Sequence, residues 1–389
     1  MAPKCAGSVS LGQFYTGESA FYNVSTDRNL REERVLMVSA FEHPAFGGLF
    51  DDPEANAIWS SQRQTEHFLA FEAAYSIGLG KAEIVEKDLA FKAATFIRNF
   101  KPDAAALRAR TSRDGVPIPE LVRQLKSTAP EYSEAIHNGA TSQDVIDTAL
   151  SLTIRDMNDL LAKRLVALSN ALSQLNERFG DNQLMGRTRM QAALMTTGST
   201  RITNWQIAVD ENTDRLNNIR SRVEQVQLGG AVGDNQKLGD KFSSIANNIA
   251  EETRLNEPGH SWHTTRGDLA EYASLLSLIS GATGKIGQDV CLMAQQGIDE
   301  IALSGGGGSS AMPHKQNPVP AELLITLARF NATQLSSMHH ALLHEQERSG
   351  SAWALEWMTL PQMAIAASRS LSACTTMSGQ ITQFGNAKS

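Results

Sequence analysis

Long stretches of this sequence repeat apolar residues at steps of three and four positions, the spacing that places them on one face of an α-helix. They run over about 150–180, 200–227, 268–301 and 321–344. At about 1.5 Å per residue, helices of such length reach ~35–50 Å, which is more than one small domain needs. Burying their apolar stripes calls for a bundle and for other subunits. The sequence therefore predicts an all-α fold, a bundle of long helices, with little β-strand.

The rest of the chain is predicted to be arranged around this bundle. A helical pattern over 53–79 and shorter helices to about 130 indicate an N-terminal helical domain. The first residues are polar and lack periodicity, so we expect either that Met37 is the natural start or that the extension is disordered. After Leu371 we expect only a polar tail. The predicted parts are the extension 1–36, the N-terminal helical domain 37–145, the central long-helix domain 146–370 and the polar tail 371–389.

Three glycines interrupt the apolar pattern of the third long helix. Gly281, Gly284 and Gly287 follow one another at three-residue steps. Glycine costs an isolated helix about 1 kcal/mol relative to alanine, so three of them need a reason. A reason exists where another helix backbone packs very close. We therefore predict a tight helix contact at these positions.

A loop over 304–320 joins two of the long helices and reads Ser-Gly-Gly-Gly-Gly-Ser-Ser-Ala-Met-Pro-His-Lys-Gln-Asn-Pro-Val-Pro. Its glycines let backbone N–H groups approach a ligand closely. Asn317 is expected to cap the next helix, with Pro318 at its first position, so that the positive helix end faces a bound anion. A flexible linker is the alternative, but Met-Pro-His-Lys-Gln-Asn-Pro is not linker composition. We interpret the loop as an anion-binding segment.

A second polar segment, His-Asn-Gly-Ala-Thr-Ser-Gln-Asp over 137–144, stands just before the first long helix. A glycine and two hydroxyls at a helix start can bind an oxyanion through side-chain O–H and backbone N–H donors. Ordinary helix capping by Thr141 or Ser142 explains the same residues. The segment alone favours capping, and the loop at 304–320 shifts the balance toward ligand binding.

The segment 308–318, Gly-Ser-Ser-Ala-Met-Pro-His-Lys-Gln-Asn-Pro, resembles the signature motif of the fumarase/aspartase superfamily. The resemblance covers about 41–370 and implies a long-helix bundle of the fumarase/aspartase type. It implies that Ser309 is the catalytic base and that Lys315 and Asn317 hold a substrate carboxylate. It further implies a homotetramer whose active sites are shared between subunits.

The same resemblance extends to the segment 137–144. Thr141 and Ser142 match a Thr-Ser pair that binds a substrate carboxylate in this superfamily, and His137 matches a histidine found there in several members. Family members commonly have a further small helical domain after the bundle. Because the pattern here ends soon after Leu371, we expect that third domain to be absent or reduced.

One position departs from the pattern of most members. In the junction Arg-Thr-Arg-Met-Gln over 187–191, argininosuccinate and adenylosuccinate lyases carry a histidine where this chain has Arg189. Arginine stays protonated and cannot shuttle a proton to a leaving group. The departure fits the cycloisomerases of the superfamily, which close a lactone in aromatic catabolism. Their nucleophile is the substrate's own carboxylate, which in reverse is a weakly basic leaving group that needs no acid.

The resemblance gives each site residue a hypothetical role on a small tricarboxylate substrate. Ser309 delivers a proton to carbon, and Lys315, Arg189 and Arg348 bind the carboxylates. The predicted catalytic residues are Ser309, Lys315 and Asn317, and the predicted substrate-binding residues are His137, Thr141, Ser142, Arg189, Gln191 and Arg348. Neither a cofactor nor a metal is expected, since no metal-ligating spacing is visible.

Two other functions remain open. One is a lyase of the same superfamily that releases fumarate from a succinyl compound such as adenylosuccinate, and Arg189 argues against it. The other is a non-catalytic structural protein, since lens δ-crystallins resemble this superfamily too. The intact Ser309, Lys315 and Asn317 argue against that.

The composition limits the partners and the compartment. The formal net charge is −7, which argues against a general nucleic-acid binder. No apolar run is long enough to span a bilayer, and the first segment has no secretory signal core. The chain has 3 cysteines, widely spaced, which suit a reducing cytoplasm rather than a disulfide framework.

Overall fold

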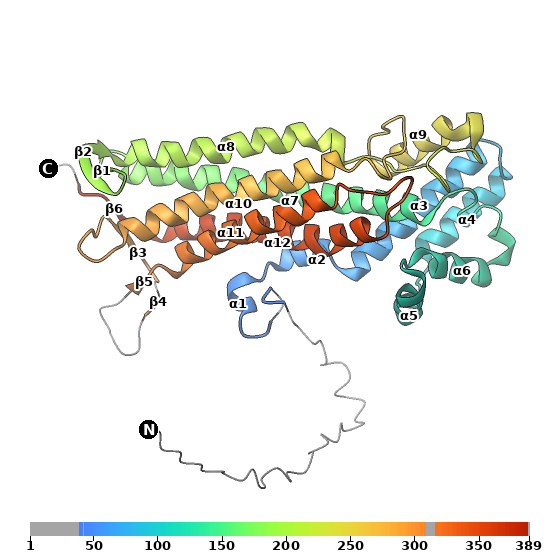
Figure 1. Ribbon diagram of the computed structural model, residues 1–389, viewed down its shortest axis with the longest axis horizontal. Coiled ribbons are helices and arrows are strands. Elements are labelled where there is room, and N and C mark those ends of the chain that lie inside the picture. The colour runs from blue at the N-terminus through green and yellow to red at the C-terminus, as the bar shows by residue number, and fades with distance from the viewer. Residues whose placement is uncertain (1–38, 42, 306, 309–315, 388–389) are drawn as a thin grey trace, which may run out of the picture.

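The computed structural model describes residues 39–41, 43–305, 307–308 and 316–387. Helices dominate this part of the chain, so the predicted all-α bundle is confirmed (Figure 1). The helices are α1 (Gly47–Phe50), α2 (Pro53–Ile58), α3 (Ser61–Lys81), α4 (Lys87–Asn99), α5 (Ala104–Asp114), α6 (Ile118–Thr128), α7 (Ser142–Phe179), α8 (Gly198–Val223), α9 (Phe242–Thr253), α10 (Gly267–Met293), α11 (Val319–His340) and α12 (Ser351–Gln380). The strands are β1 (Gln183–Thr188), β2 (Gln191–Thr197), β3 (Ile301–Leu303), β4 (Gly307–Gly308), β5 (Gln316–Asn317) and β6 (Ile381–Phe384).

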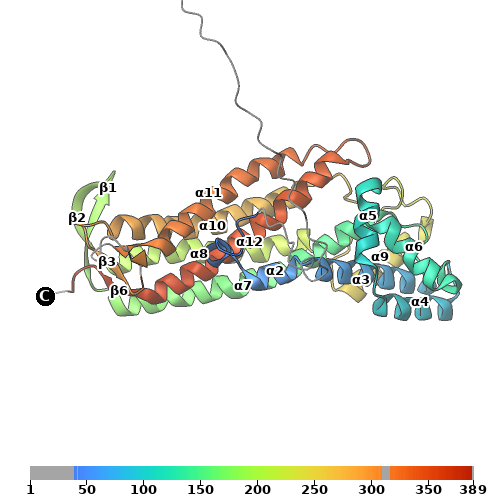
Figure 2. The same ribbon diagram turned by 90° about the horizontal axis from the view of Figure 1, so that it is seen from below.

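Five long helices, α7, α8, α10, α11 and α12, form an elongated bundle (Figures 1 and 2). Their inward stripes meet in one hydrophobic core, where Leu161, Leu276 and Met363 are fully buried. Trp205 lies in the same core and donates its indole N–H to Asp289, 2.7 Å away. At about 1.5 Å per residue, the 38 residues of α7 span about 57 Å. The bundle therefore holds groups at its two ends far apart.

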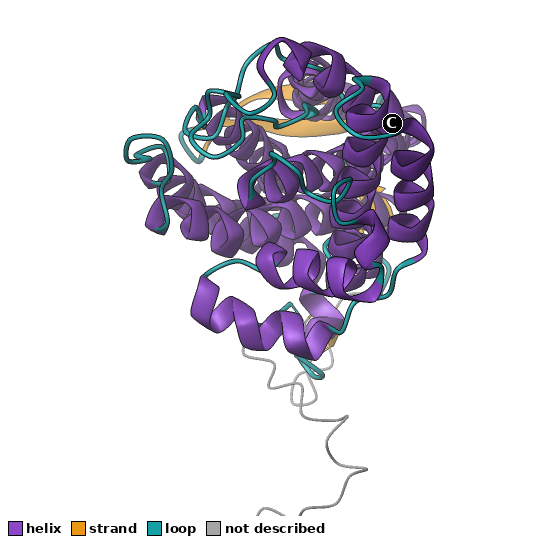
Figure 3. Cartoon of the chain, turned by 90° about the vertical axis from the view of Figure 1, so that its right-hand side faces the viewer, coloured by secondary structure: helices purple, strands orange, loops and turns teal. Residues whose placement is uncertain are grey.

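Shorter helices gather at one end of the bundle, the end that faces the viewer in Figure 3. Helices α3 to α6 and α9 surround a second hydrophobic core. Helix α9 comes from a later part of the chain, yet Ile245 packs directly against Gly78 of α3. Conversely, Phe41 belongs to the core of the bundle. Because the cores do not divide at one chain position, the domain limits 37–145 and 146–370 stay a prediction.

Small antiparallel strand pairs occupy the other end of the bundle. The chain leaves α7 and forms the hairpin β1–β2, with Thr188 paired to Gln191 across a two-residue turn. Strand β6 pairs with β3, and β4 pairs with β5. The junction at 187–191 is thus a β-hairpin. The sequence signal of these two short strands is weak compared with the apolar periodicity of the long helices.

The predicted start of the fourth long helix is wrong. Asn317 lies in β5 and pairs with Gly307, while Pro318 takes the N-cap position and Val319 begins α11. Neither Asn317 nor Pro318 is helical because the extended pairing with β4 continues through Asn317. Pro318 was predicted at the first helical position and instead occupies the N-cap position.

The predicted polar tail is also wrong over the described part of 371–389. Helix α12 runs through this region to Gln380 despite Pro361 in its interior, and β6 follows it. Leu371, Cys374 and Phe384 are fully buried in the core of the bundle. Alanine, serine and threonine make up much of this helix, so its apolar stripe is weak in the sequence.

Several helix ends differ from their predicted positions. The pattern over 53–79 is two helices, because Ser60 leaves the helical conformation and accepts the N–H of Arg63 to cap α3. The third long helix ends at Met293, eight residues before the predicted Ile301. None of the helices in the described ranges is both long and apolar enough to cross a membrane.

Close packing explains two of the three glycines in α10. A Cβ at Gly287 would lie 2.5 Å from the carbonyl oxygen of Ala321 in α11, and one at Gly284 would lie 2.5 Å from the Cβ of Ala328. Both distances are shorter than any side chain tolerates, so the predicted tight contact is confirmed there. A Cβ at Gly281 would meet no described atom within 4 Å. The prediction is therefore wrong for Gly281 within this chain.

Candidate active site

The turn before α7 is held by a buried carboxylate, Asp144. Its two oxygens accept the backbone N–H groups of Thr141 at 2.9 Å, Gly229 at 2.8 Å and Gly230 at 3.1 Å. His263 lies 2.8 Å from the same carboxylate. Thr141 is the N-cap residue of α7, so the predicted helix capping is confirmed for Thr141. Asp144 therefore fixes the turn and the glycine loop relative to each other.

Arg348 lies beside this turn. Its Nε donates to the side-chain oxygen of Gln143 at 3.0 Å, and a terminal nitrogen donates to the carbonyl of Ala231 at 3.1 Å. The arginine side chain is nonetheless exposed. Residues 137–144, 229–231 and Arg348 thus form one polar surface, which we call the turn site.

A buried ionic network packs beneath the turn site, on the core side of α7. Arg266 donates to Asp147 at 2.7 Å and to Glu356 at 2.5 Å, and all of these groups are buried. Burial alone raises the pKa of the Glu356 carboxyl, but the hydrogen bond and charge of Arg266 outweigh burial and lower it. Trp353 donates its indole N–H to Asp147 at 3.0 Å. The network joins α7, α10 and α12, so the start of α12 is fixed against the turn.

His137 also belongs to the turn site. It adopts a φ of 54°, a left-handed conformation that is uncommon for a residue other than glycine. Its Nδ1 lies 2.6 Å from a carboxylate oxygen of Glu72 in α3, and Glu72 is fully buried. Glu72 was not among the predicted site residues. The structure places it in the core but in contact with a predicted site residue.

Arg189 occupies the tip of the β1–β2 hairpin, at the other end of the bundle. Arg189 and Met190 have φ of 50° and 68°, as the central residues of a type I′ turn do. Such turns favour glycine and asparagine, because other side chains crowd the backbone at positive φ. Both side chains are exposed, as is Gln191 at the start of β2. Strained residues at an exposed tip are typical of functional sites.

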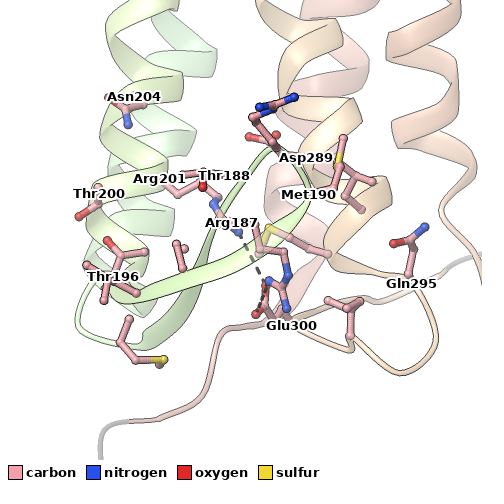
Figure 4. Close-up of a pocket in the computed structure, with 18 of the residues that line it drawn as sticks. Arg187, Thr188, Met190, Thr196, Thr200, Arg201, Asn204, Asp289, Gln295 and Glu300 are labelled. Atoms are coloured by element: carbon pink, nitrogen blue, oxygen red, sulfur yellow. Dashed lines mark hydrogen bonds and ion pairs between the residues drawn. The ribbon is translucent and has the colours of Figure 1, made fainter.

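The hairpin forms one wall of a large open pocket (Figure 4). Its volume is about 880 Å³, and helices α8 and α10 supply the other walls. Arg187 points toward Glu300 and forms an ion pair with it at 2.7 Å. Arg201 lies 3.8 Å from the same carboxylate. Arg189 lines this pocket too. We call it the hairpin pocket.

The predicted site residues thus fall into two groups within one chain. His137, Thr141, Ser142 and Arg348 lie at the turn site, while Arg189, Gln191 and Asn317 lie at the opposite end (Figure 1). The length of α7, about 57 Å, separates them. Ser309 and Lys315 lie outside the described residues. No single chain brings the two groups together.

The sequence reasoning missed the residues that support the turn site. Gln143 and Asp144 were part of the recognised segment but had no predicted role, and Glu72 was not connected to it. The adjacent glycines at 229–230 were a usable signal, because both backbone N–H groups bind one carboxylate. Among the described residues, no group of three or more His, Cys, Asp or Glu side chains could hold a metal ion.

The sequence of this chain matches a known enzyme family. A family model described as lyase matches residues 54–331, and the chain belongs to this lyase family. It is similar to 3-carboxy-cis,cis-muconate cycloisomerase from Pseudomonas putida, with 34% identity over 333 residues that cover 84% of this chain and 79% of that protein. It is also similar to N-acetyl-S-(2-succino)cysteine lyase from Enterococcus italicus, with 30% identity over 81% of this chain and 70% of that protein.

Solved structures give the same result. The 3-carboxy-cis,cis-muconate lactonizing enzyme from Pseudomonas putida superposes with a TM-score of 0.82 and 33% identity, over 88% of this chain and 78% of that one. A fumarate lyase from Mesorhizobium sp. BNC1 superposes with a TM-score of 0.80 and 32% identity, over 86% and 76%. The superfamily membership predicted from the loop motif is therefore confirmed.

Proposed function

We propose that this chain is a cycloisomerase that converts 3-carboxy-cis,cis-muconate to a carboxymuconolactone. The observation that carries the proposal is Arg189, which stands where argininosuccinate and adenylosuccinate lyases carry a histidine, the general acid in adenylosuccinate lyase. A lactone-forming reaction needs no such acid, because the group that leaves in reverse is a carboxylate. Relatives that bear the cycloisomerase name, at 34% identity, support the same choice.

The reaction is an internal addition in which no atom is gained or lost. One substrate carboxylate forms a C–O bond to the doubly bonded carbon that carries the 3-carboxy group. The electron pair of the double bond moves to the neighbouring carbon, which passes through an aci-carboxylate and takes up a proton from Ser309. Because both partners belong to one molecule, holding its bent conformer supplies much of the rate.

The binding residues have to offset three carboxylates and the charge of the intermediate. We assign this to Lys315, Arg189 and Arg348, since fixed cations and donors are the largest stabilising influence in such sites. Thr141, Ser142, Asn317, Gln191 and His137 are the assigned hydrogen-bond donors. No cofactor or metal takes part in this mechanism.

The mechanism requires more than one subunit. The turn site and the hairpin pocket are separated by the length of α7, so a common cavity needs the turn site of one chain and the hairpin of another. We propose a homotetramer with shared active sites, acting in the cytoplasm in aromatic catabolism. Mixing Ser309→Ala chains with Arg348→Leu chains, each impaired alone, tests this sharing. Exchange of subunits should restore activity, and no recovery would mean that each site is built by one chain.

The experiment that tests the function offers the enzyme separate substrates without added metal. Loss of the conjugated-diene absorbance of 3-carboxy-cis,cis-muconate, without fumarate, is the expected result. Release of fumarate from adenylosuccinate or another succinyl compound would favour a lyase instead. The N-acetyl-S-(2-succino)cysteine lyases among the relatives are the observation in favour of that second candidate. Inactivity on all substrates would favour a structural protein.

A further inference from the structure

One face of helix α3 holds the strained turn that carries His137. Three polar side chains, spaced at three and four residues along the helix, contact this turn. Tyr75 donates its hydroxyl to the carbonyl of Asn138 at 2.8 Å, and Ser76 donates to the carbonyl of Ala135 at 2.6 Å. Glu72 meets the imidazole of His137 between them. These contacts flank His137 on both sides, so α3 holds the turn in which His137 has a positive φ.

The carboxylate of Glu72 depends on His137. Its side chain has no exposure, whereas the side chain of His137 keeps 15%. One carboxylate oxygen lies 2.6 Å from Nδ1 of His137, and the other is buried without a hydrogen-bond partner in the described part of the chain. A buried carboxylate with a single partner is stable only if that partner offsets its charge. The geometry therefore favours an imidazolium, and the His137 side chain is partly exposed.

Building on the proposed function, we propose that Glu72 is a positioning residue that keeps His137 as an imidazolium facing the turn site. His137 then adds a charged donor for a substrate carboxylate beside Arg348. Both side chains border the turn site. Arg348 donates to the carbonyl of Gly230 at 3.4 Å, and a Cβ added at Gly230 would lie 3.2 Å from the carbonyl of Gly139, two residues after His137. This assigns a fourth cation to a polyanionic substrate.

The charges around His137 agree with this role. Burial lowers the pKa of His137, but the charge and hydrogen bond of Glu72 outweigh burial, and Asp144 of α7 adds to the effect, so the pKa is raised. Lys126 of α6 acts in the opposite direction. Lys237 and Tyr75 also approach the turn, at Gly139. Substrate binding should accordingly be strongest below the raised pKa and weaken as pH rises through it.

The test compares Glu72→Gln with the wild type in two independent measurements. The first is the pH dependence of carbethoxylation of His137 by diethyl pyrocarbonate, read by peptide mass spectrometry with the exposed His260 as internal reference. Only a neutral imidazole reacts, so the reaction at His137 should begin at lower pH in the variant. The second is the KM for 3-carboxy-cis,cis-muconate against pH, where the rise of KM should also move to lower pH.

The size of the effect and the controls make the outcome clear. Losing one hydrogen bond to a charged group should raise KM at neutral pH roughly tenfold or more in Glu72→Gln and His137→Gln, with a smaller change in kcat. Glu72→Asp should recover part of the loss. Glu134→Gln, an exposed glutamate three residues from His137, is the charge-matched control and should behave as wild type. If a single variant fails to fold, the double variant Glu72→Gln/His137→Gln removes the buried charge and supplies the KM measurement.

Two results would overturn the assignment: a carbethoxylation profile of His137 that Glu72→Gln leaves unchanged, or an unchanged KM in His137→Gln. Failure of the proposed function is a separate outcome. In that case the wild type does not consume 3-carboxy-cis,cis-muconate, while carbethoxylation still reports on the Glu72–His137 pair. The donor role is then measured by calorimetric binding of propane-1,2,3-tricarboxylate to wild type and His137→Gln. Equal affinities would refute it.

Discussion

Arg348 donates from its Nε to the side-chain oxygen of Gln143 across 3.0 Å, which joins the segment before α12 to the first turn of α7. Gln143 is fully buried. Its amide nitrogen donates to a carboxylate oxygen of Asp147 at 3.1 Å and to the carbonyl of His263 at 2.8 Å. The glutamine therefore cannot rotate without losing all these bonds. The buried Gln143 side chain thereby fixes the orientation of the exposed Arg348.

Replacing Gln143 by leucine should disorder Arg348 and raise KM for the substrate roughly tenfold, since a hydrogen bond to a charged group is lost. The measurement is a double-mutant cycle with Arg348→Leu. If Gln143 acts through Arg348, adding Gln143→Leu to Arg348→Leu should change KM little further. Fully additive effects would show that Gln143 has a separate role.

Ser309→Ala should lower kcat by roughly 10²–10⁴, because positioned proton transfer contributes about that factor. Far-UV circular dichroism should be unchanged, since the substitution removes one hydroxyl. Ser310→Ala, the adjacent serine, is the matched control and should retain turnover. Near-normal kcat in Ser309→Ala would remove this serine from the mechanism.

Arg189→Leu should raise KM or lower kcat, because a cation that faces the substrate is lost. Arg189→Lys should recover part of the effect, as lysine keeps the charge but not the planar fork of donors. Arg108→Leu, an exposed arginine elsewhere on the chain, controls for the loss of one positive charge. Kinetics identical to wild type in Arg189→Leu would make the residue structural.

Two glycines of α10 form a matched pair for stability. Gly287→Ala should destabilise the fold by about 1–3 kcal/mol, the usual cost of overpacking, because the new methyl would meet the carbonyl of Ala321. Gly281→Ala faces open space and should stabilise by about 0.4–1 kcal/mol through helix propensity. Denaturant midpoints measure both. A destabilising Gly281→Ala would indicate that another subunit packs on α10 at this position.

Asp156 should make stability depend on pH in the acid range. Burial alone raises the pKa of Asp156, but the nearby His67 and the hydrogen bonds and charge of Arg63 outweigh burial and lower it to about 2. A lowered pKa contributes stability above the unfolded value of about 3.9 and loses it as pH falls through the folded value. Asp156→Asn should therefore cost about 1–2 kcal/mol at neutral pH, allowing for the partly exposed Arg63.

The difference between Asp156→Asn and wild type should shrink as pH falls from about 4 to about 2. Denaturation midpoints measured across that range check it. Asp181→Asn, an exposed aspartate that makes no ion pair in the described part of the chain, is the control. A difference that stays constant with pH would show that Asp156 acts through packing rather than charge.

How far the sequence predicts this fold depends on the element. The stripe of α7 was readable because its apolar residues recur without interruption. Helix α12 was missed, since it contains Pro361 and its buried face is built largely from alanine and serine. The cap at Asn317 was predicted wrongly because local preference for capping competes with pairing to Gly307, which only the folded loop provides.

The predicted site shows the same limit. The loop motif at 308–318 was specific enough to identify the family, and Arg189 was readable as a departure from it. The contact of Glu72 with His137 and that of His263 with Asp144 had no local signal. The positive φ of Arg189 and His137 was equally invisible, because neither residue type marks such a turn.

By itself the sequence determined that the chain makes long amphipathic helices and belongs to a superfamily of lyases, because helical periodicity and a contiguous motif are local properties. The tertiary structure alone decided which residues face one another. Contacts such as Glu72 with His137 and Gln143 with Arg348 join positions far apart in the chain, and helix packing rather than local preference brings them together. The rigid length of α7 likewise decided that His137 and Arg189 of one chain lie at opposite ends of the bundle.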